Sequence, residues 1–247
     1  MKLRSKILLA LISVGVIPLV IALWVVGDMV ASELEGQVQV RAHDSANFIE
    51  QTTTKTSSDD LALVALLSSN PFLVNAVYSA GLSGDVSQLT SFLSNLENLS
   101  FDQLQVLDKD GKQILRMFMN GNQEIPSTSG TEHPVIEASL EGEAYAESGL
   151  FDGRMAITSA APISMYGEPI GHLVAVTYFD EKLATRLKTL SRMEIAFFDE
   201  GGIFASTSPE LNMVDLQAIL SSQSYVREIN GKKNFITYNS IAGKAVS

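Results

Sequence analysis

The chain opens with a long apolar run that contains no charged residue. As an α-helix, Ile7 to Val26 would rise about 30 Å, which matches the hydrocarbon core of a bilayer. Lys2, Arg4 and Lys6 precede the run, and a basic flank of this kind stays in the cytoplasm. A cleaved signal peptide with a site near Val30 is the alternative, but its apolar core is normally only about 7–15 residues long. The pattern therefore predicts one uncleaved span of the inner membrane, with the N-terminus inside and the remaining chain outside.

Beyond the span, apolar residues at helical spacing predict that the helix continues over about 31–51. Leu34, Val38 and Phe48 fall on one stripe of this helix. An amphipathic helix that leaves the bilayer needs a surface against which to bury its stripe. We therefore expect a parallel homodimer along this segment, although the protein's own sheet is a competing surface.

The next stretch, 51–60, contains no apolar residue. It is either a solvated helical stalk or a break in the helix. Ser58 or Asp59 can cap a helix that restarts at Leu61. Asn70-Pro71 would stop that second helix.

From Phe101 onward, short apolar strands alternate with turn residues. Three successive strands joined by tight turns predict an antiparallel meander. The elements expected in this part are a preceding helix at about 85–99, strands at 104–107, 112–119, 143–151, 154–165 and 169–179, a polar loop at 120–131 and a short helix at 134–140.

The same order begins again after an amphipathic helix at 180–191, which Asp180 is placed to cap. The second copy is shorter, and its fifth strand has barely begun where the chain ends. Asn230-Gly231 is a strong signal for a type I′ hairpin. The elements expected here are strands at 194–199, 203–207, 225–230 and 232–240 and a short helix at 213–220.

Two such copies on a long helix leaving a membrane span resemble the double Cache sensor domains of bacterial transmembrane receptors, which are tandem PAS-like modules. The resemblance covers roughly 31–247. Three segments carry it most specifically. The segment 106–115 looks like the first hairpin of the membrane-distal module, and 160–163 with 169–176 look like the last two strands of that module. The segment 197–206 looks like the opening of the proximal module. The resemblance implies an α+β fold with antiparallel sheets.

The resemblance divides the chain into six parts. They are a basic tail at 1–6, a transmembrane helix at 7–26, a helical stalk with N-terminal helices at 31–100, a membrane-distal Cache module at 101–179, a linker helix at 180–191 and an incomplete membrane-proximal module at 192–247. Such receptors usually continue into a second transmembrane helix and a cytoplasmic signalling part. We therefore expect a fragment of a receptor whose catalytic output would lie beyond Ser247, or an unusual protein that lacks its output.

The net charge and the composition of the chain limit which classes of partner it can bind. The whole chain carries a formal net charge of −11, and the first six residues contribute +3, which leaves −14 for the rest. This excess argues against nucleic acid as a partner and against docking onto anionic lipid. There is no cysteine, so neither disulfides nor thiolate chemistry are expected.

No catalytic or metal-binding pattern emerges from the sequence. His43, His133 and His172 lie in different predicted elements, without metal-ligand spacing. The segment 108–111 is a turn rather than a calcium loop, because its glycine comes too early. We therefore expect no catalytic residue, metal or cofactor in this chain. The amino-acid-binding pattern of some Cache domains needs a tryptophan, and because the sole one, Trp24, lies in the span, that ligand class is not carried over.

One cation stands out as a candidate ligand-binding residue. Arg154 opens a strand whose neighbours on the same face, Thr158 among them, are small and leave room for an anionic ligand. The alternative is an arginine at the rim that pairs with Asp152 or Glu147.

Further candidates for the same site are Arg116, Tyr145 and Tyr178. Arg116 lies in the middle of a strand and points either to solvent or into a pocket. Strand alternation puts Arg154 and Thr158 on the face toward the polar loop, and an apolar set, Met155, Ile157 and Ile163, on the face toward the helices.

Three functions are compatible with these features of the sequence. The favoured one is the extracytoplasmic ligand-sensing part of a receptor of the sensor histidine kinase, chemoreceptor or diguanylate cyclase type, which binds a small molecule, with an anion favoured by Arg154. An exported enzyme on a membrane tether would need a convergent set of titratable groups, and none can be assembled from the sequence. The third is a membrane-tethered structural or protein-binding module of the envelope without a small-molecule ligand.

Overall fold

The computed structural model describes residues 3–96, 99–119, 123–124, 133–199, 201–213, 217, 224–229 and 232–238. The chain divides into two compact units. One combines 1–46 with 215–238, and the other combines 47–214 with 239–247.

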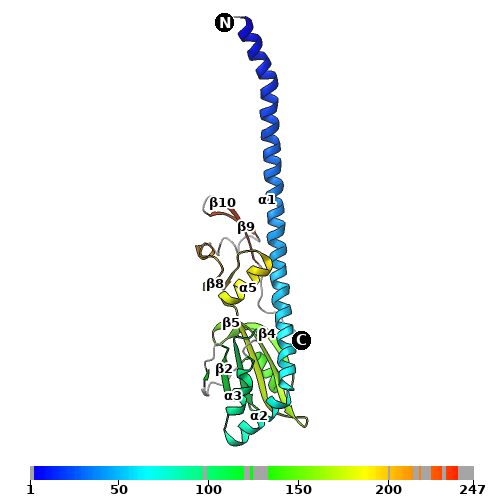
Figure 1. The fold of residues 1–247 in the computed structure, drawn as a ribbon, viewed down its shortest axis with the longest axis vertical. Helices are drawn as coiled ribbons and strands as arrows, with labels where there is room; N and C mark the ends of the chain where they lie inside the picture. Colours follow the sequence, from blue (N-terminus) through cyan, green and yellow to red (C-terminus); the bar gives the residue numbers. More distant parts are fainter. Residues whose placement is uncertain are drawn as a thin grey trace. The chain divides into compact units, whose positions relative to one another are not determined.

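The N-terminal helix, α1, runs without interruption from Leu3 to Ser68 (Figure 1). The polar stretch 51–60 is therefore helical, and of the two alternatives left open by the sequence the structure has the continuous helix without a restart at Leu61. Thr53 and Thr54 bond their hydroxyls to the carbonyls of Ile49 and Glu50 one turn earlier, at 2.9 and 3.0 Å. These bonds satisfy the threonine hydroxyls inside the helix, and Thr53, Ser57 and Asp60 of this stretch are buried, so the helix is held by packing although it lacks apolar residues.

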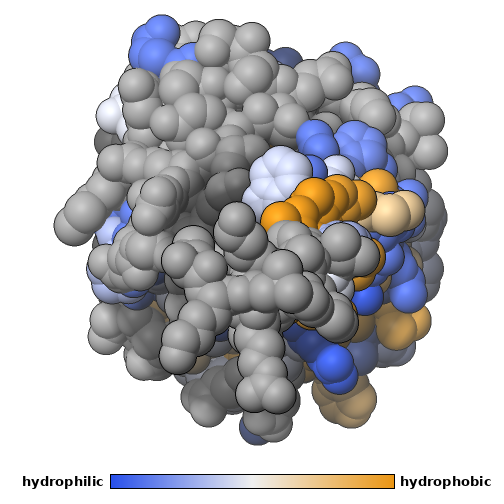
Figure 2. All heavy atoms as spheres, turned by 90° about the horizontal axis from the view of Figure 1, so that it is seen from above, coloured by the Kyte–Doolittle hydropathy of each residue, from blue (hydrophilic) through white to orange (hydrophobic). Residues whose placement is uncertain are grey.

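The segment of α1 from residue 15 onward is long and apolar enough to cross a membrane by length and composition. Its large apolar side chains between Val16 and Val30 are exposed. The view in Figure 2 likewise shows hydrophobic atoms at the surface beside hydrophilic ones.

Two short helices follow α1. Asn70-Pro71 ends α1 as predicted and starts α2, Pro71–Ser83, where Asn70 Oδ1 accepts a hydrogen bond from Phe72 N at 2.9 Å. The pattern of the sequence had not indicated α2. The next helix, α3, covers Ser87–Ser94 and is shorter than the helix expected at 85–99.

Six antiparallel strands form the main sheet, in the order β3-β2-β1-β6-β5-β4. The predicted meander at 143–179 is confirmed as β4, β5 and β6, and β1 adds to its β6 edge. The strands are β1 Gln103–Asp108, β2 Gln113–Phe118, β3 Gln123–Glu124, β4 Tyr145–Phe151, β5 Arg154–Met165 and β6 Glu168–Tyr178. The segment 108–111 is a turn, as predicted, in which Asp108 Oδ1 accepts hydrogen bonds from the backbone of Asp110 and Lys112.

Helices lie against both faces of this sheet. One face packs on α1, α2 and α3, and its core includes Ile163, as expected from strand alternation. The other face packs on the short helix α4, Pro134–Leu140, through Val135 and Ile136.

The next elements are the helix α5, Glu181–Ser191, and the hairpin of β7, Ala196–Asp199, and β8, Gly202–Ser206. Asp180 caps α5 as predicted, since its carboxylate accepts a hydrogen bond from Leu183 N at 2.9 Å. The 3₁₀ turn η1 spans Leu211–Met213, and β9, Ser224–Ile229, pairs with β10, Lys232–Thr237. The predicted Asn230-Gly231 turn, most of the 213–220 helix and most of the 120–131 loop lie outside the described residues.

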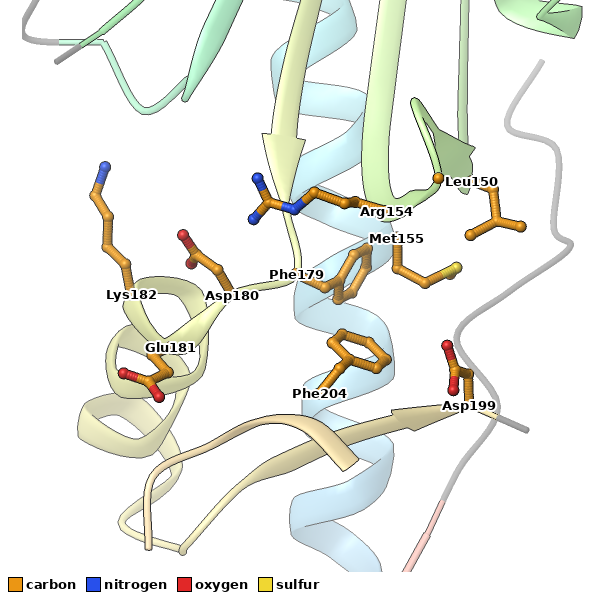
Figure 3. Close-up of a pocket in the computed structure, with 10 residues that line it drawn as sticks. Leu150, Arg154, Met155, Phe179, Asp180, Glu181, Lys182, Asp199 and Phe204 are labelled. Carbon is orange, nitrogen blue, oxygen red and sulfur yellow. The ribbon is translucent and has the colours of Figure 1, made fainter. Parts of the chain in front are cut away.

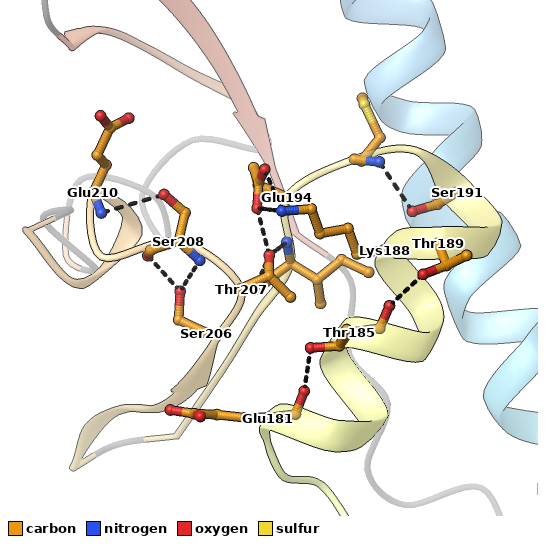
Figure 4. A network of polar contacts seen from close by, with 12 residues as sticks. Glu181, Thr185, Lys188, Thr189, Ser191, Glu194, Ser206, Thr207, Ser208 and Glu210 are labelled. Carbon is orange, nitrogen blue, oxygen red and sulfur yellow. Dashed lines mark hydrogen bonds and ion pairs between the residues drawn. The ribbon is translucent and has the colours of Figure 1, made fainter.

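A polar network joins α5 to the β7–β8 hairpin (Figure 4). The Lys188 ammonium lies 2.7 Å from a carboxylate oxygen of Glu194, and Thr207 donates its hydroxyl to Glu194 at 2.6 Å. Thr207 Oγ1 also accepts a hydrogen bond from Ile195 N at 2.8 Å. The bonds from Lys188 and Thr207 hold the pKa of Glu194 below its ordinary value.

Part of the interface between α1 and the sheet is polar. Ser57 and Asp60 of α1 are buried against this sheet face together with Ser159 and Thr177. Thr177 donates its hydroxyl to Asp60 Oδ2 at 3.2 Å. Burial raises the pKa of Asp60 from 3.8 to about 6, and the bond from Thr177 opposes that rise.

Asp60→Asn should stabilise the protein at pH 7.5. A carboxyl whose pKa is raised by folding stabilises the native state while it is protonated, and that contribution is lost as pH rises from about 4 through about 6. The shift corresponds to at most about 3 kcal/mol. Melting curves between pH 4 and 8 should show the variant more stable at the high end and with a flatter pH profile. Asp59→Asn, at the exposed neighbouring position, is the control. An unchanged pH profile in Asp60→Asn would contradict this prediction.

Candidate functional site

All five candidate ligand-binding residues lie on the same face of the six-stranded sheet. Residues that are directly opposite on paired strands point to the same side. The register pairs Arg116 with Gln105, Thr158 with Val176, Tyr145 with Ala160, and Ala156 with Tyr178. This face is the one covered by α4, and it is opposite to the face that packs on α1 and α2.

A chain of buried polar groups crosses the middle of this face. Gln103 and Gln105 are completely buried. The Tyr178 hydroxyl donates to Gln103 Oε1 at 3.1 Å. When its side-chain oxygen faces Arg116, Gln105 accepts hydrogen bonds from Arg116 Nε and Nη2 at 2.8 Å and from Gln103 Nε2 at 2.6 Å. The chain thus connects the Tyr178 phenol to the Arg116 guanidinium.

Arg116 is aimed inward, because only 16% of its side chain is exposed. Its guanidinium forms an ion pair with Asp152 at the tip of the β4–β5 turn. The alternative in which Asp152 pairs with Arg154 is therefore wrong. Among the described side chains, the partner of Asp152 is Arg116, which lies on the same face in strand β2, beyond β6 and β1.

Arg154 is exposed, and its guanidinium lies over the ring of Tyr178, 4.0 Å from the centroid. This is a cation–π contact. Burial raises the pKa of Tyr178, and the negative charge of Asp152 adds to the rise, while Arg116 and Arg154 oppose it. Both arginines and Asp152 therefore act electrostatically on the Tyr178 phenol. We take this phenol as the centre of the candidate site.

Two hydroxyl groups complete the candidate set. Thr158 is completely buried, and its Oγ1 has no hydrogen-bond partner within the described protein. Such a group is uncommon in a native core, and it lies beneath the surface of this face. Tyr145 is half-buried nearer the edge of the sheet, and burial together with the neighbouring Glu147 carboxylate raises its pKa.

The helix α4 closes part of this face. His133 caps it, since Nδ1 accepts a hydrogen bond from Val135 N at 3.3 Å, and its ring contacts Phe151 edge-on. His172 is buried, and its Nδ1 lies 2.9 Å from the Ser139 hydroxyl, so it is a core residue. Burial lowers the pKa of both histidines. Among the described residues, no cluster of histidines and carboxylates could hold a metal ion.

A cleft of about 670 Å³ opens at the end of the site, beside the β4–β5 turn (Figure 3). Phe179 and Phe204 lie in its apolar part together with Leu150 and Met155, and Arg154 is drawn above the two rings. The lining residues are Leu150, Gly153, Arg154, Met155, Phe179, Asp180, Glu181, Lys182, Asp199 and Phe204.

Sequence reasoning missed three residues of the site. Gln103 and Gln105 alternate with Leu104 and Val106 along β1, and two amides on one face of an otherwise apolar strand were a usable signal. Asp152 was considered only as a neighbour of Arg154. Its contact with Arg116 depends on the order of the strands, which the sequence does not display.

The described fold is an antiparallel sheet with helices on both faces, preceded by a long apolar helix, and its site is built on one sheet face. That arrangement defines a sensor module of the Cache type. The chain belongs to the family described as the double sensory domain of two-component sensor kinases (dCache_3), which matches residues 37–232. The resemblance drawn from the sequence and the α+β fold class are thereby confirmed.

Solved structures of sensory domains share this fold. The ligand-binding domain of the Campylobacter jejuni chemoreceptor Tlp3, in complex with L-norvaline, is 14% identical with a TM-score of 0.52, over 83% of this chain and 85% of that one. The periplasmic domain of Vibrio cholerae LuxQ is also 14% identical with a TM-score of 0.52, over 79% of this chain and 98% of that one. The sequence matches none of the curated proteins with which it was compared. At such identities the likeness concerns the fold alone.

The two arginines should differ in their effect on stability. Arg116→Ala leaves the buried amide of Gln105 and the Asp152 carboxylate without their partner, which should cost about 1–3 kcal/mol. Arg154→Ala removes only an exposed cation–π contact, which should cost about 1 kcal/mol or less. Thermal unfolding of the two variants measures the difference between their losses of unfolding free energy. Equal losses of stability would show that Arg116 is not held as described.

Proposed function

We propose that this chain is the extracytoplasmic ligand-sensing part of a transmembrane receptor. The helix at 7–26 anchors it in the inner membrane, with the N-terminus inside and the sensory part outside. Membership of the sensory family and the long apolar helix support this proposal. The output of the receptor is of the histidine kinase, chemoreceptor or diguanylate cyclase type, and the role proposed for the sensory part is ligand binding rather than catalysis. The module boundaries at 101–179 and 192–247 belong to the same proposal.

The ligand binds on the α4 face of the six-stranded sheet. The observation that carries this assignment is the convergence of Arg116, Arg154, Thr158 and Tyr178 on one face of the sheet, two of them cations in a strongly acidic protein. Guanidinium groups recognise carboxylate and phosphate through charge-assisted hydrogen bonds. We therefore propose a small anionic ligand, with Tyr145 at the edge of the same face.

Signalling uses a parallel homodimer along α1. Part of the stripe is exposed, with Leu34, Val38 and Phe48 each more than two-fifths accessible, whereas Ala42 and Ile49 of the same stripe pack against the protein itself. An exposed apolar stripe at this spacing fits the seam between two parallel helices.

A membrane-tethered protein-binding module is the second candidate function. Its support is the exposure of three large apolar residues, Leu66 at the end of α1 and Phe72 and Leu82 on α2. A module of this kind would bind no small molecule.

Removal of Arg154 should weaken ligand binding. A panel of small carboxylates and phosphates is tested against the full chain in detergent by thermal shift, and each hit is titrated. For a hit, Arg154→Ala should reduce affinity about ten- to a hundredfold, the value of one charge-assisted hydrogen bond, about 1.5–3 kcal/mol. Lys109→Ala, which removes an equal charge from an exposed turn, should leave affinity unchanged. Unchanged affinity in Arg154→Ala would exclude Arg154 from the site, and a panel without hits would favour the protein-binding function.

The dimer is tested with single cysteines in the cysteine-free chain. Cysteine at Leu34, Val38 or Arg41 should form disulfide-linked dimers in membranes under mild oxidation. Cysteine at Gly36 or Gln39, on the side of the helix away from the stripe, should cross-link weakly. Equal cross-linking at all five positions would count against the parallel helix pair.

A further inference from the structure

The acidic partner of Arg116 comes from a tight turn with a fixed geometry. The last pair of the β4–β5 ladder is Phe151 with Arg154, so Asp152 and Gly153 form a two-residue turn. Both have positive φ, 50° and 75°, as a type I′ turn requires. This backbone holds the Asp152 side chain over the sheet face, where it meets the Arg116 guanidinium.

The two partners of this ion pair differ in their exposure. Arg116 is held from behind by Gln105, and its side chain is only 16% exposed, whereas the side chain of Asp152 is 45% exposed. Exchanging Asp152 for another anion would thus leave the guanidinium in place and return the displaced carboxylate to water. Beyond its Cα, an aspartate side chain is an acetate group, so it occupies the space that a ligand carboxylate would take.

From this geometry we propose that Asp152 is an internal competitor that occupies the anion position on Arg116 until an anionic ligand displaces it. The inference rests on the proposed function for the location of the ligand and adds the regulation of that site. A carboxylate on the same chain is present at high effective concentration. It therefore sets the ligand concentration at which the site fills, and it excludes weakly bound anions.

Displacement of Asp152 would also change the structure outside the site. Gly153, Arg154 and Met155 follow directly and line the cleft against Phe179 (Figure 3). Met155 packs on the apolar cluster that contains Leu183 of α5, and Ile49 of α1 packs on the same cluster. The turn thus links the anion position to the helix that leads toward the membrane.

Acetate tests this proposal without knowledge of the natural ligand. Asp152→Gly removes the internal carboxylate, and glycine accepts the positive φ of the turn. In the full chain in detergent, about 100 mM sodium acetate should raise the melting temperature of Asp152→Gly by a few degrees relative to equal sodium chloride, because RT ln(1 + [L]/Kd) is gained only by a free site. The wild type should not respond. Arg116→Gln in the Asp152→Gly background should abolish the response.

Asp152→Asn, which keeps a side chain suited to the turn but loses the charge, is the second variant in case Asp152→Gly does not fold. It should respond to acetate in the same direction with a smaller amplitude. An equal acetate response in wild type and variant, or a response that survives Arg116→Gln, would overturn the proposal. The outcome can also separate the two proposals. If no carboxylate or phosphate of the panel binds the wild type but acetate stabilises Asp152→Gly, the proposed ligand-sensing function is wrong, whereas the competition for Arg116 is supported.

Discussion

The register in which β1 pairs with β6 is the constraint on which the rest of the structure depends. It places Gln103 opposite Val176 and Gln105 opposite Val174. Because side chains alternate along a strand, a slip by one residue would turn both amides toward α1 and α2 and would place Leu104 and Val106 on the α4 face. The same register thus decides the apolar face that packs on α1 and α2 and the polar face that carries the candidate site.

Polar groups are buried on both sides of this sheet, for different reasons. On the α4 face, Gln103, Gln105 and Arg116 satisfy one another and hold a cation that faces the site. On the α1 face, the Asp60 carboxylate accepts a hydrogen bond from the Thr177 hydroxyl, yet burial still raises its pKa. A connected network of this kind rigidifies its surroundings. Both faces also hold buried hydroxyl groups without a hydrogen-bond partner among the described residues, Thr158 on the α4 face and Ser57 and Ser159 on the α1 face.

The charge of the chain makes the site chemically distinct. An excess of acidic residues repels anions in general, so an anion site needs local cations held in position. The structure places two guanidinium groups near one phenol and sets an internal carboxylate against one of them. If Asp152 competes for Arg116 as proposed, selectivity would come from competition between carboxylates as well as from direct contact.

The sequence by itself determined the features that local physical chemistry controls. The apolar run Ile7–Val26, the helix α4 and the β4–β5–β6 meander each follow from the length of an apolar run, a helix start at proline or a tight turn. Only the tertiary structure decided the continuity of α1 through 51–60, because its polar stripe is stabilised by burial against a sheet that forms far along the chain. It also decided the pairing of Arg116 with Asp152 instead of Arg154 with Asp152. Side chains 36 residues apart meet there because of the strand order, and strand order is a property of the assembled sheet rather than of any local segment.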